Sequence, residues 1–214
     1  MQSVALIDYG SGNLRSAEKA LRKAAEGLNT AAEIVVTADP DIVARADRLV
    51  LPGVGAFAAC MGALSSRDGL IAAMTEAVRG RGAPFLGVCV GMQLLADKGL
   101  EFGETPGLGW IPGEVSKLQP ANAAAKIPHM GWNALEDLAD RPLLAGLDAA
   151  PHMYFTHSFA FRPADPSHVI ATTDHGGRFT AAVAKDNVMG VQFHPEKSQA
   201  QGIRLLANFL ETRA

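Results

Sequence analysis

The sequence reads Pro84-Phe85-Leu86-Gly87-Val88-Cys89-Val90-Gly91 around its second cysteine. The apolar run before this cysteine predicts a buried strand, and the glycine on each side of it permits a sharp turn. A strand, a tight turn and a helix that together present a nucleophile form the nucleophile elbow of many hydrolases. We therefore expect Cys89 at such an elbow, where the helix starting near Gly91 favours the thiolate and the Val90 N–H can bind an oxyanion.

The residues around this segment repeat the alternation of strand, glycine-containing turn and helix. Short apolar runs predict strands at residues 4–7, 33–37, 49–51 and 85–88. Helix-forming residues predict helices at residues 14–25, 56–64 and 69–79, with another that begins at residues 92–96. This alternation is typical of an α/β fold with a mostly parallel central sheet flanked by helices.

The second half of the chain follows a different pattern. Strands are predicted there at residues 114–118, 153–156, 169–173, 179–184 and 188–192, and turn residues join the later ones as hairpins. We therefore expect an antiparallel, strand-rich second half that ends in a helix at residues 199–212. Residues 99–113 are rich in Gly and Pro and are expected to form a surface loop. Because no linker or repeat interrupts the chain, residues 1–214 are expected to form one domain.

Composition excludes several classes of function. The 214 residues carry a formal charge of −3 without a cluster of Lys and Arg, which argues against nucleic acid or an anionic membrane as the main partner. No apolar stretch is long enough for a signal peptide or a membrane span. With two cysteines and six scattered histidines, we expect no disulfide framework and no metal site. We therefore expect a cytoplasmic protein that uses no cofactor.

The segment His194-Pro195-Glu196 supplies the partners that a catalytic cysteine needs. It follows the apolar run at residues 188–191, so it is expected just beyond the end of a strand. Proline biases the preceding histidine away from helix, and in an extended chain residues two apart face the same side. His194 can then move protons to and from the Cys89 sulfur while Glu196 orients the imidazole.

These segments resemble the class I, triad-type glutamine amidotransferases. Residues 87–93 (Gly-Val-Cys-Val-Gly-Met-Gln) are similar to the nucleophile motif of that family, with valine where leucine is commoner after the cysteine. Residues 192–196 are similar to its His/Glu motif, and residues 52–55 (Pro-Gly-Val-Gly) occupy the place of its oxyanion loop. The resemblance spans almost the whole chain and implies hydrolysis of the glutamine side-chain amide, with the ammonia handed to a second active site.

Within this family the resemblance is strongest to the branch that serves histidine biosynthesis. The matching segments are residues 8–14, 52–57, 128–133, 154–159 and 194–198. Residue 54 is valine where most members of the family have a second glycine, and Phe159 stands where tyrosine is commoner. The resemblance implies that the ammonia goes to a separate (β/α)8-barrel cyclase subunit, because this chain has no room for the ammonia-consuming catalyst.

The resemblance also implies a role for particular residues. The catalytic triad would be Cys89, His194 and Glu196. The oxyanion hole would comprise Gly53, Val54, Gly55 and Val90. Substrate glutamine would be bound by Gln93, Glu101, His157, Ser158 and Phe159, although the loop at residues 97–103 departs from the family pattern. The partner would meet Asn13, Met130, Trp132, Asn133 and Lys197.

Three other interpretations remain open. A thiol hydrolase could use the same elbow without acting on glutamine. A catalytically silent binding subunit is a second interpretation, against which the presence of all three triad residues argues. The third is another amidotransferase branch, such as the glutaminases of pyridoxal phosphate or anthranilate synthesis. Val54, residues 130–133 and the pair Lys197-Ser198 argue against that branch.

Overall fold

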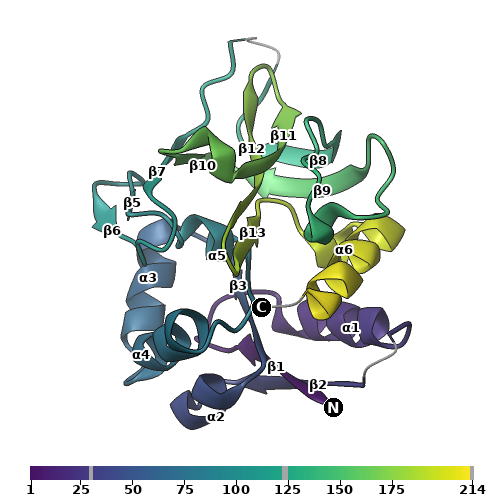
Figure 1. Cartoon of the computed structure of the whole chain (residues 1–214). Helices are drawn as coiled ribbons and strands as arrows, with labels where there is room; N and C mark the ends of the chain where they lie inside the picture. The colour runs from purple at the N-terminus through teal and green to yellow at the C-terminus, as the bar shows by residue number, and fades with distance from the viewer. Residues whose placement is uncertain (29–30, 122–124, 213–214) are drawn as a thin grey trace.

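The computed structural model describes residues 1–28, 31–121 and 125–212. A seven-stranded sheet forms its centre, with the strand order β11-β12-β13-β4-β3-β1-β2 (Figure 1). Its strands are β1 (Gln2–Ile7), β2 (Ala32–Thr37), β3 (Arg48–Gly53), β4 (Phe85–Cys89), β11 (Val169–Asp174), β12 (Arg178–Lys185) and β13 (Val188–Val191). The five strands from β13 to β2 are parallel, whereas β12 and β11 add antiparallel pairs at one edge. The predicted mostly parallel sheet is confirmed.

Helices cover both faces of this sheet. The helices are α1 (Leu14–Ala25), α2 (Pro40–Arg45), α3 (Phe57–Ser65), α4 (Leu70–Thr75), α5 (Val90–Gln93) and α6 (Gln199–Glu211). In Figure 1, α1 and α6 lie together on one side, and α3 and α4 lie on the other. The sequence explains α1 well, because Ala20, Leu21 and Ala24 fall on its buried stripe. No helix in the described ranges has the length and apolar character that crossing a membrane requires.

Two smaller sheets lie beside the central one. The first has the order β10-β7-β5-β6, and the second pairs β8 with β9 in an antiparallel ladder. Their strands are β5 (Lys98–Gly99), β6 (Thr105–Pro106), β7 (Gly113–Lys117), β8 (His129–Ala134), β9 (His152–His157) and β10 (Phe159–Pro163). Short 3-10 turns are present at η2 (Pro142–Leu144), η3 (Pro166–His168) and η4 (Pro195–Lys197). The expectation of a strand-rich second half with antiparallel pairs is confirmed.

Two expectations about local structure were wrong, and a third was right in extent but contains a change of helix type. The helix expected from residues 92–96 is instead the single turn α5, because the backbone groups of Leu94 and Leu95 bond to the segment at residues 108–111. The helix expected at residues 69–79 is α4 followed by a π-helical turn, η1 (Glu76–Gly80). The stretch at residues 99–113 is not wholly a surface loop, since it contributes β6 and buries Trp110 and Ile111.

The order of the strands decides where the reactive residues meet. Strands β4 and β13 are neighbours, with Val88 opposite Val191, so Cys89 and His194 both lie just beyond that pair. On the other side of β4, Gly53 at the end of β3 is paired with Cys89. Ligands of parallel α/β sheets bind at the carboxyl ends of the strands. The oxyanion loop, the cysteine and the histidine therefore come together at one edge.

Candidate active site

Cys89 sits at a strained turn. It is the last residue of β4 and has a φ of 55°, a conformation that residues other than glycine rarely adopt. The glycines beside it are required by close packing: a β-carbon on Gly91 would collide with the Leu51 carbonyl oxygen, and one on Gly87 with the Gly91 carbonyl oxygen. The sequence prediction of an elbow is met in geometry, but α5 is one turn long, so its dipole supplies little of the thiolate stabilisation.

His194 and Glu196 form a buried pair beyond β13. The Nδ1 atom of His194 lies 2.8 Å from Oε1 of Glu196, and their side chains are 2% and 4% exposed. The backbone is extended at His194, as the following proline requires, but it then enters the 3-10 turn η4. The expectation that the segment is extended throughout was therefore wrong. Ser198 fixes this turn, because its hydroxyl donates to the His194 carbonyl (2.6 Å) and accepts from the Tyr154 N–H (3.0 Å).

The surroundings of His194 favour its charged form. Burial lowers the pKa of this imidazole, but hydrogen-bonding and charge interactions with Cys89 and Glu196 outweigh burial and raise the pKa to about 9. The Nε2 atom is buried without a hydrogen-bond partner among the described residues, and so is Oε2 of Glu196. The approach of the sulfur to Nε2 is thus looser than a full hydrogen bond, as is common in catalytic pairs without substrate. With Nδ1 hydrogen-bonded to Glu196 and Nε2 without a described partner, the His194 imidazole can accept and donate a proton at Nε2.

A cavity of about 310 Å³ opens in front of these groups. It is lined by Val54, Gly55, Cys89, Val90, Gln93, Glu101, Pro128, Thr156, His157, Ser158, Phe159 and His194. The structure therefore brings together the nucleophile and base of the expected triad and all five expected substrate residues. Glu196 lies behind His194, away from this lining. A space of this volume suits a small molecule such as an amino acid.

Two of the expected substrate residues already have protein partners. Gln93 is buried, and its Nε2 donates to the Phe159 carbonyl (2.9 Å) and to Oε1 of Gln192 (3.0 Å). Both bonds use the amide nitrogen, so the Gln93 carbonyl oxygen is the polar atom left for the cavity. Glu101 accepts the Phe57 N–H at 2.8 Å and so caps α3, whose own Ala56 cannot. Its other carboxylate oxygen is left for a ligand.

The loop after β3, which lines the cavity through Val54 and Gly55, is tied by hydrogen bonds to the turn after β1. The Val54 N–H donates to the Ser11 hydroxyl (3.3 Å), which itself donates to the Val54 carbonyl (2.8 Å). The Tyr9 hydroxyl donates to the carbonyl of Pro52 (2.8 Å), near the end of β3. In this state the Val54 N–H, an expected oxyanion donor, is therefore occupied by Ser11. Gly55 has a φ of 104°, which a residue with a side chain would resist.

The residues expected to face a partner differ in exposure. Met130 is 64% and Trp132 47% exposed on neighbouring parts of β8. Lys197 is exposed as well, and its ammonium lies 5.5 Å from the Tyr154 ring centroid. Asn13 is half-buried at the start of α1. The Asn133 side chain, by contrast, is engaged in hydrogen bonds within the chain.

Sequence reasoning missed one residue that touches the nucleophile. Gln192 is fully buried at the end of β13, and its Nε2 donates to the Cys89 sulfur at 3.8 Å. A donor at this place stabilises negative charge on sulfur. Gln192 belongs to the quoted His/Glu motif, and its position two residues before His194 was the available signal, because alternate residues of a strand share a face.

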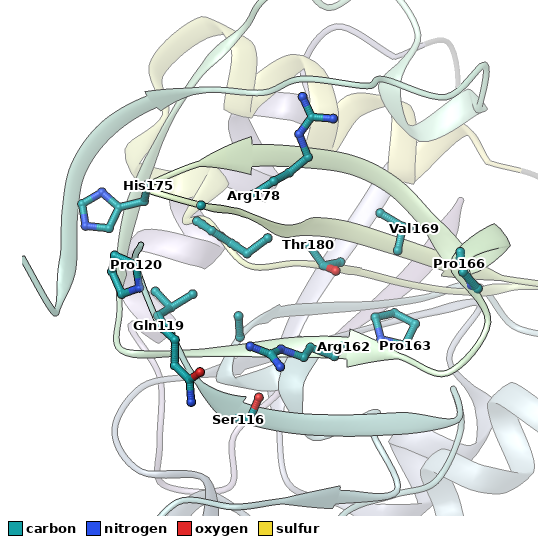
Figure 2. Close-up of a pocket in the computed structure, with 14 residues that line it drawn as sticks. Ser116, Gln119, Pro120, Arg162, Pro163, Pro166, Val169, His175, Arg178 and Thr180 are labelled. Atoms are coloured by element: carbon teal, nitrogen blue, oxygen red, sulfur yellow. The ribbon is translucent and has the colours of Figure 1, made fainter. Parts of the chain in front are cut away.

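A second cavity, of about 340 Å³, lies apart from these groups. Figure 2 shows it between β7, β10 and the β11–β12 hairpin, with Ser116, Arg162 and Thr180 among its lining. None of Cys89, His194 and Glu196 lines it. The nucleophile, base and acid thus single out the smaller cavity as the candidate active site.

The fold and this site define a glutaminase-type thiol enzyme, and comparison with known proteins agrees. The chain belongs to the class-I glutamine amidotransferase family, whose model matches residues 5–212. It is 65% identical over 213 residues to "Imidazole glycerol phosphate synthase subunit HisH" of Caulobacter vibrioides, with 100% of each chain covered. It is 59% identical over 208 residues to the protein of the same name from Rhodospirillum rubrum, with 97% of each covered.

Solved structures support the fold alone. A crystal structure described as a glutamine amidotransferase superposes with a TM-score of 0.70 at 22% identity and covers 97% of each chain. A putative GMP synthase protein from Thermoplasma acidophilum gives a TM-score of 0.66 at 20% identity, over 99% of this chain and 93% of that one. The expected class I amidotransferase fold is therefore confirmed.

Proposed function

We propose that this chain, as one domain spanning residues 1–214, is the glutaminase subunit of an imidazole glycerol phosphate synthase in histidine biosynthesis. It hydrolyses L-glutamine to glutamate and ammonia. The ammonia passes to a (β/α)8-barrel cyclase subunit, with which the chain forms a cytoplasmic heterodimer and which makes imidazole glycerol phosphate and AICAR. The relatives at 65% and 59% identity, each named as a subunit of that synthase, support this assignment and the existence of a partner.

The chemistry follows from the placement of three side chains. The Cys89 thiolate attacks the side-chain amide carbon of glutamine, and the carbonyl oxygen takes up the negative charge. Protonated His194 then gives its proton to the amide nitrogen, so that ammonia leaves and a thioester to Cys89 remains. His194, now neutral, takes a proton from water, whose oxygen attacks the thioester. Glutamate leaves and the thiolate returns, with Glu196 orienting and stabilising the imidazolium in both steps.

The observation that carries this proposal is the position of His194. Its Nδ1 is bound to Glu196 at 2.8 Å, and its pKa is raised to about 9 by groups that include Cys89. A histidine with this pKa is poised as imidazolium beside Cys89, where it can stabilise negative charge on sulfur and give a proton to the leaving amine. The expected oxyanion donors Gly53, Val54 and Gly55 lie at and just beyond the end of β3, and Val90 begins α5. These positions beside Cys89 support their proposed role.

The test is release of ammonia from glutamine by the purified chain together with its cyclase partner. The wild-type pair is expected to turn over, whereas Cys89→Ala is expected to lose about 10⁶-fold in kcat, because the three groups act as a unit. Cys60→Ala is the comparison, since Cys60 is also buried and free but lies in α3. Because the Cys60 sulfur donates to the Val54 carbonyl (3.4 Å), this variant is expected to change turnover far less than Cys89→Ala does, and not to leave it untouched. Near-normal ammonia release from Cys89→Ala would overturn the proposal that the reaction passes through a thioester to Cys89. Hydrolysis of other amides or esters with no action on glutamine would instead favour a different thiol hydrolase.

Pull-down of a barrel cyclase tests the partner. Capture of a synthase component from the pyridoxal phosphate or anthranilate pathways in its place would assign the chain to another branch of the family. The expected partner-facing residues Met130, Trp132 and Lys197 form an exposed group that suits such a surface, whereas Asn13 and Asn133 are less exposed. Substitution of Trp132 by Asp is expected to weaken capture without changing the fold, since its side chain is 47% exposed.

A further inference from the structure

Three histidines outside the triad cluster beside the active-site cavity. The His129 ring stacks on that of His175 at 4.2 Å and on that of Phe155 at 4.8 Å. Its Nδ1 lies 3.1 Å from Nε2 of His157, and both of these histidines are buried. His157 lines the cavity, but His129 does not, and the reaction described above makes no use of its side chain.

The hydrogen bond between the two histidines has a direction that can be worked out from its inner end. Nδ1 of His157 lies 2.9 Å from the Phe159 carbonyl oxygen. A carbonyl oxygen only accepts, so His157 carries its proton on Nδ1. In a neutral imidazole the other nitrogen, Nε2, is then an acceptor. The proton between the two rings must therefore belong to Nδ1 of His129.

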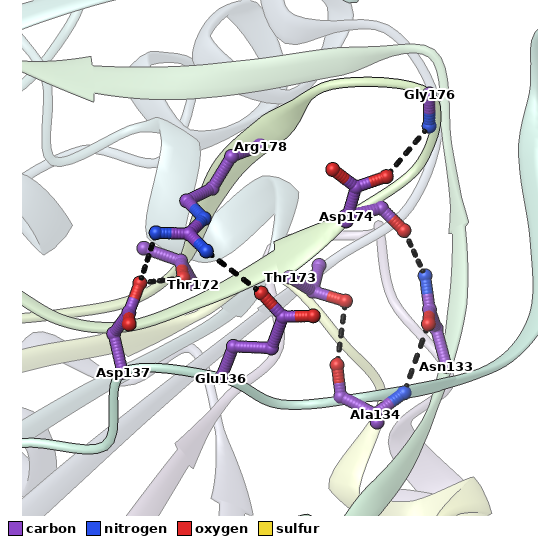
Figure 3. A network of polar contacts seen from close by, with 9 residues as sticks. All are labelled: Asn133, Ala134, Glu136, Asp137, Thr172, Thr173, Asp174, Gly176 and Arg178. Atoms are coloured by element: carbon purple, nitrogen blue, oxygen red, sulfur yellow. Dashed lines mark hydrogen bonds and ion pairs between the residues drawn. The ribbon is translucent and has the colours of Figure 1, made fainter.

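The same direction follows independently from the other end of this series of hydrogen bonds, at Asn133. Oδ1 of Asn133 accepts the Ala134 N–H at 2.9 Å, and Nδ2 donates to the Asp174 carbonyl at 2.7 Å (Figure 3). These two backbone partners fix which atom of the amide is nitrogen. The same Nδ2 lies 3.3 Å from Nε2 of His129, which must accept. His129 is thus also the Nδ1–H tautomer.

Both rings are kept neutral by their surroundings. Burial, and then repulsion from His175, lowers the pKa of His129 to about 4. Burial lowers the pKa of His157 to about 3; the bond to the Phe159 carbonyl opposes this shift, and the charges of His129, His175 and His194 add to it. A proton added to either ring would place two N–H groups against each other along this chain. The neutral, directed arrangement is therefore the one that fits at neutral pH.

At its other end, this series of hydrogen bonds reaches the substrate site through the Phe159 carbonyl. The Phe159 carbonyl that accepts from His157 also accepts from Nε2 of Gln93, at 2.9 Å. That nitrogen donates in turn to Gln192, whose own Nε2 donates to the Cys89 sulfur. The position of the Phe159 carbonyl thus controls how Gln93 presents its oxygen to the cavity and how Gln192 meets the nucleophile.

We propose that His129 is a positioning residue for the glutaminase reaction, because its Nδ1–H donor holds His157 in the Nδ1–H tautomer that anchors the Phe159 carbonyl. Without this donor, His157 is free to move its proton to Nε2. The lone pair of Nδ1 then faces the lone pairs of the Phe159 carbonyl oxygen, and the repulsion releases Gln93. This role rests on the proposed function, but the tautomer on which it depends is a property of the chain alone.

The direct test is nitrogen-15 NMR of the histidine side chains in the full-length chain. In the wild type, His129 and His157 are expected to show protonated Nδ1 and unprotonated Nε2, without change between pH 8 and pH 5.5. In His129→Phe, which keeps a ring against Phe155 and His175, His157 is expected to gain the Nε2–H form. His129→Asn places an amide donor where Nδ1 was and is expected to restore the wild-type tautomer. His152→Phe, at an exposed site on the same strand as His157, is the control and is expected to change nothing.

Kinetics with glutamine give the second readout. His129→Phe is expected to lower kcat/KM about tenfold, as loss of one buried hydrogen bond does, mainly through a higher KM. His129→Asn is expected to recover most of that loss. Protonated Nε2 on His157 in the wild type, titration of either ring near pH 6.5, or equal losses in the Phe and Asn variants would each overturn the proposal. Wild-type chain that shows the expected tautomers but hydrolyses no glutamine with the cyclase and its substrate bound would contradict the proposed function instead.

Discussion

Nδ1 of His194 is 2.8 Å from Oε1 of Glu196, although the two residues are separated by a proline and lie on a 3-10 turn. The turn, more than an extended strand, brings the carboxylate against the imidazole. Both side chains are almost fully buried, so water does not compete for this contact. The bond fixes the imidazole with Nε2 toward the cavity, where a proton must be moved.

This contact predicts a graded response to mutation. Glu196→Gln is expected to lower kcat by about 10⁴-fold, less than the roughly 10⁶-fold loss for Cys89→Ala or His194→Ala, because Glu196 orients the base and does not transfer the proton. The double variant Cys89→Ala with Glu196→Gln is expected to be no worse than Cys89→Ala alone. The measurement is single-turnover glutamine hydrolysis with the cyclase partner bound. A Glu196→Gln enzyme as inactive as Cys89→Ala would contradict the ranking.

The raised pKa of His194 predicts a pH-dependent stability. Folding raises this pKa from 6.5 to about 9, so the folded state binds the proton more tightly than the unfolded chain. The contribution is fully present below pH 6.5 and is lost as the pH rises from 6.5 through 9, and its upper limit is about 3 kcal/mol. Urea unfolding of wild type and His194→Gln should therefore converge in free energy of unfolding as the pH rises over this range. If the difference in free energy of unfolding between the two proteins did not change with pH, the proposal that His194 is protonated in the folded state would be refuted.

The elbow glycine gives a prediction about stability. Gly91→Ala is expected to lower the free energy of unfolding by about 3 kcal/mol, since the new methyl group would overlap the Leu51 carbonyl oxygen, a backbone atom that cannot easily move. Gly62→Ala is the matched control: it lies in α3, and no described atom outside its own stretch of helix is within 4 Å of the added carbon. There alanine is expected to stabilise by up to about 1 kcal/mol. Chemical denaturation measures both, and equal effects would show that close packing at the elbow is unimportant.

Much of the fold could be predicted from the sequence because the inner strands of its central sheet are buried on both faces. The strands β1, β3 and β4 are buried over most of their length, so each appears in the sequence as a continuous apolar run. Helix α2 was missed despite a clear signal, since Asp39 caps it and Pro40 begins it. Strand β8 could not be found this way, because its two sides are neither regularly buried nor regularly exposed.

Sequence alone predicts some residues of the candidate site and misses others, and the difference has a physical reason. The nucleophile, base and acid have unusual local sequence, since a strained elbow needs its glycines and a pre-proline histidine is extended. The roles of Gln192 and His129 depend on contacts with residues 103 and 28 positions away in the chain. Such contacts leave little local pattern: for Gln192 the one local signal is its place two residues before His194, and the contact of His129 with His157 has none. The bond of Glu101 to the start of α3 is of the same kind.

The oxyanion loop leads to the last prediction, that the chain is nearly idle until its partner acts. Thiolate and base need an N–H that points at the oxyanion, and one such donor contributes about 3 kcal/mol, a hundredfold or more in rate. The Val54 N–H is instead bonded to the Ser11 hydroxyl, and its carbonyl is held by the same oxygen. To reach the active state, the peptide before Val54 must rotate, and a β-branched residue resists the positive φ that glycine accepts.

Removal of the Ser11 hydroxyl should therefore loosen the resting loop. In Ser11→Ala, glutamine hydrolysis by the isolated chain is expected to rise several-fold, because two hydrogen bonds of roughly 1 kcal/mol each no longer hold the inactive peptide. Ser11→Thr keeps the hydroxyl and is the control. The measured quantity is the ratio of turnover with the cyclase and its substrate to turnover of the isolated chain, expected to be large in wild type and Ser11→Thr and smaller in Ser11→Ala. A wild-type ratio near one would refute gating by this loop, and it would leave the roles of Cys89, His194 and Glu196 untouched.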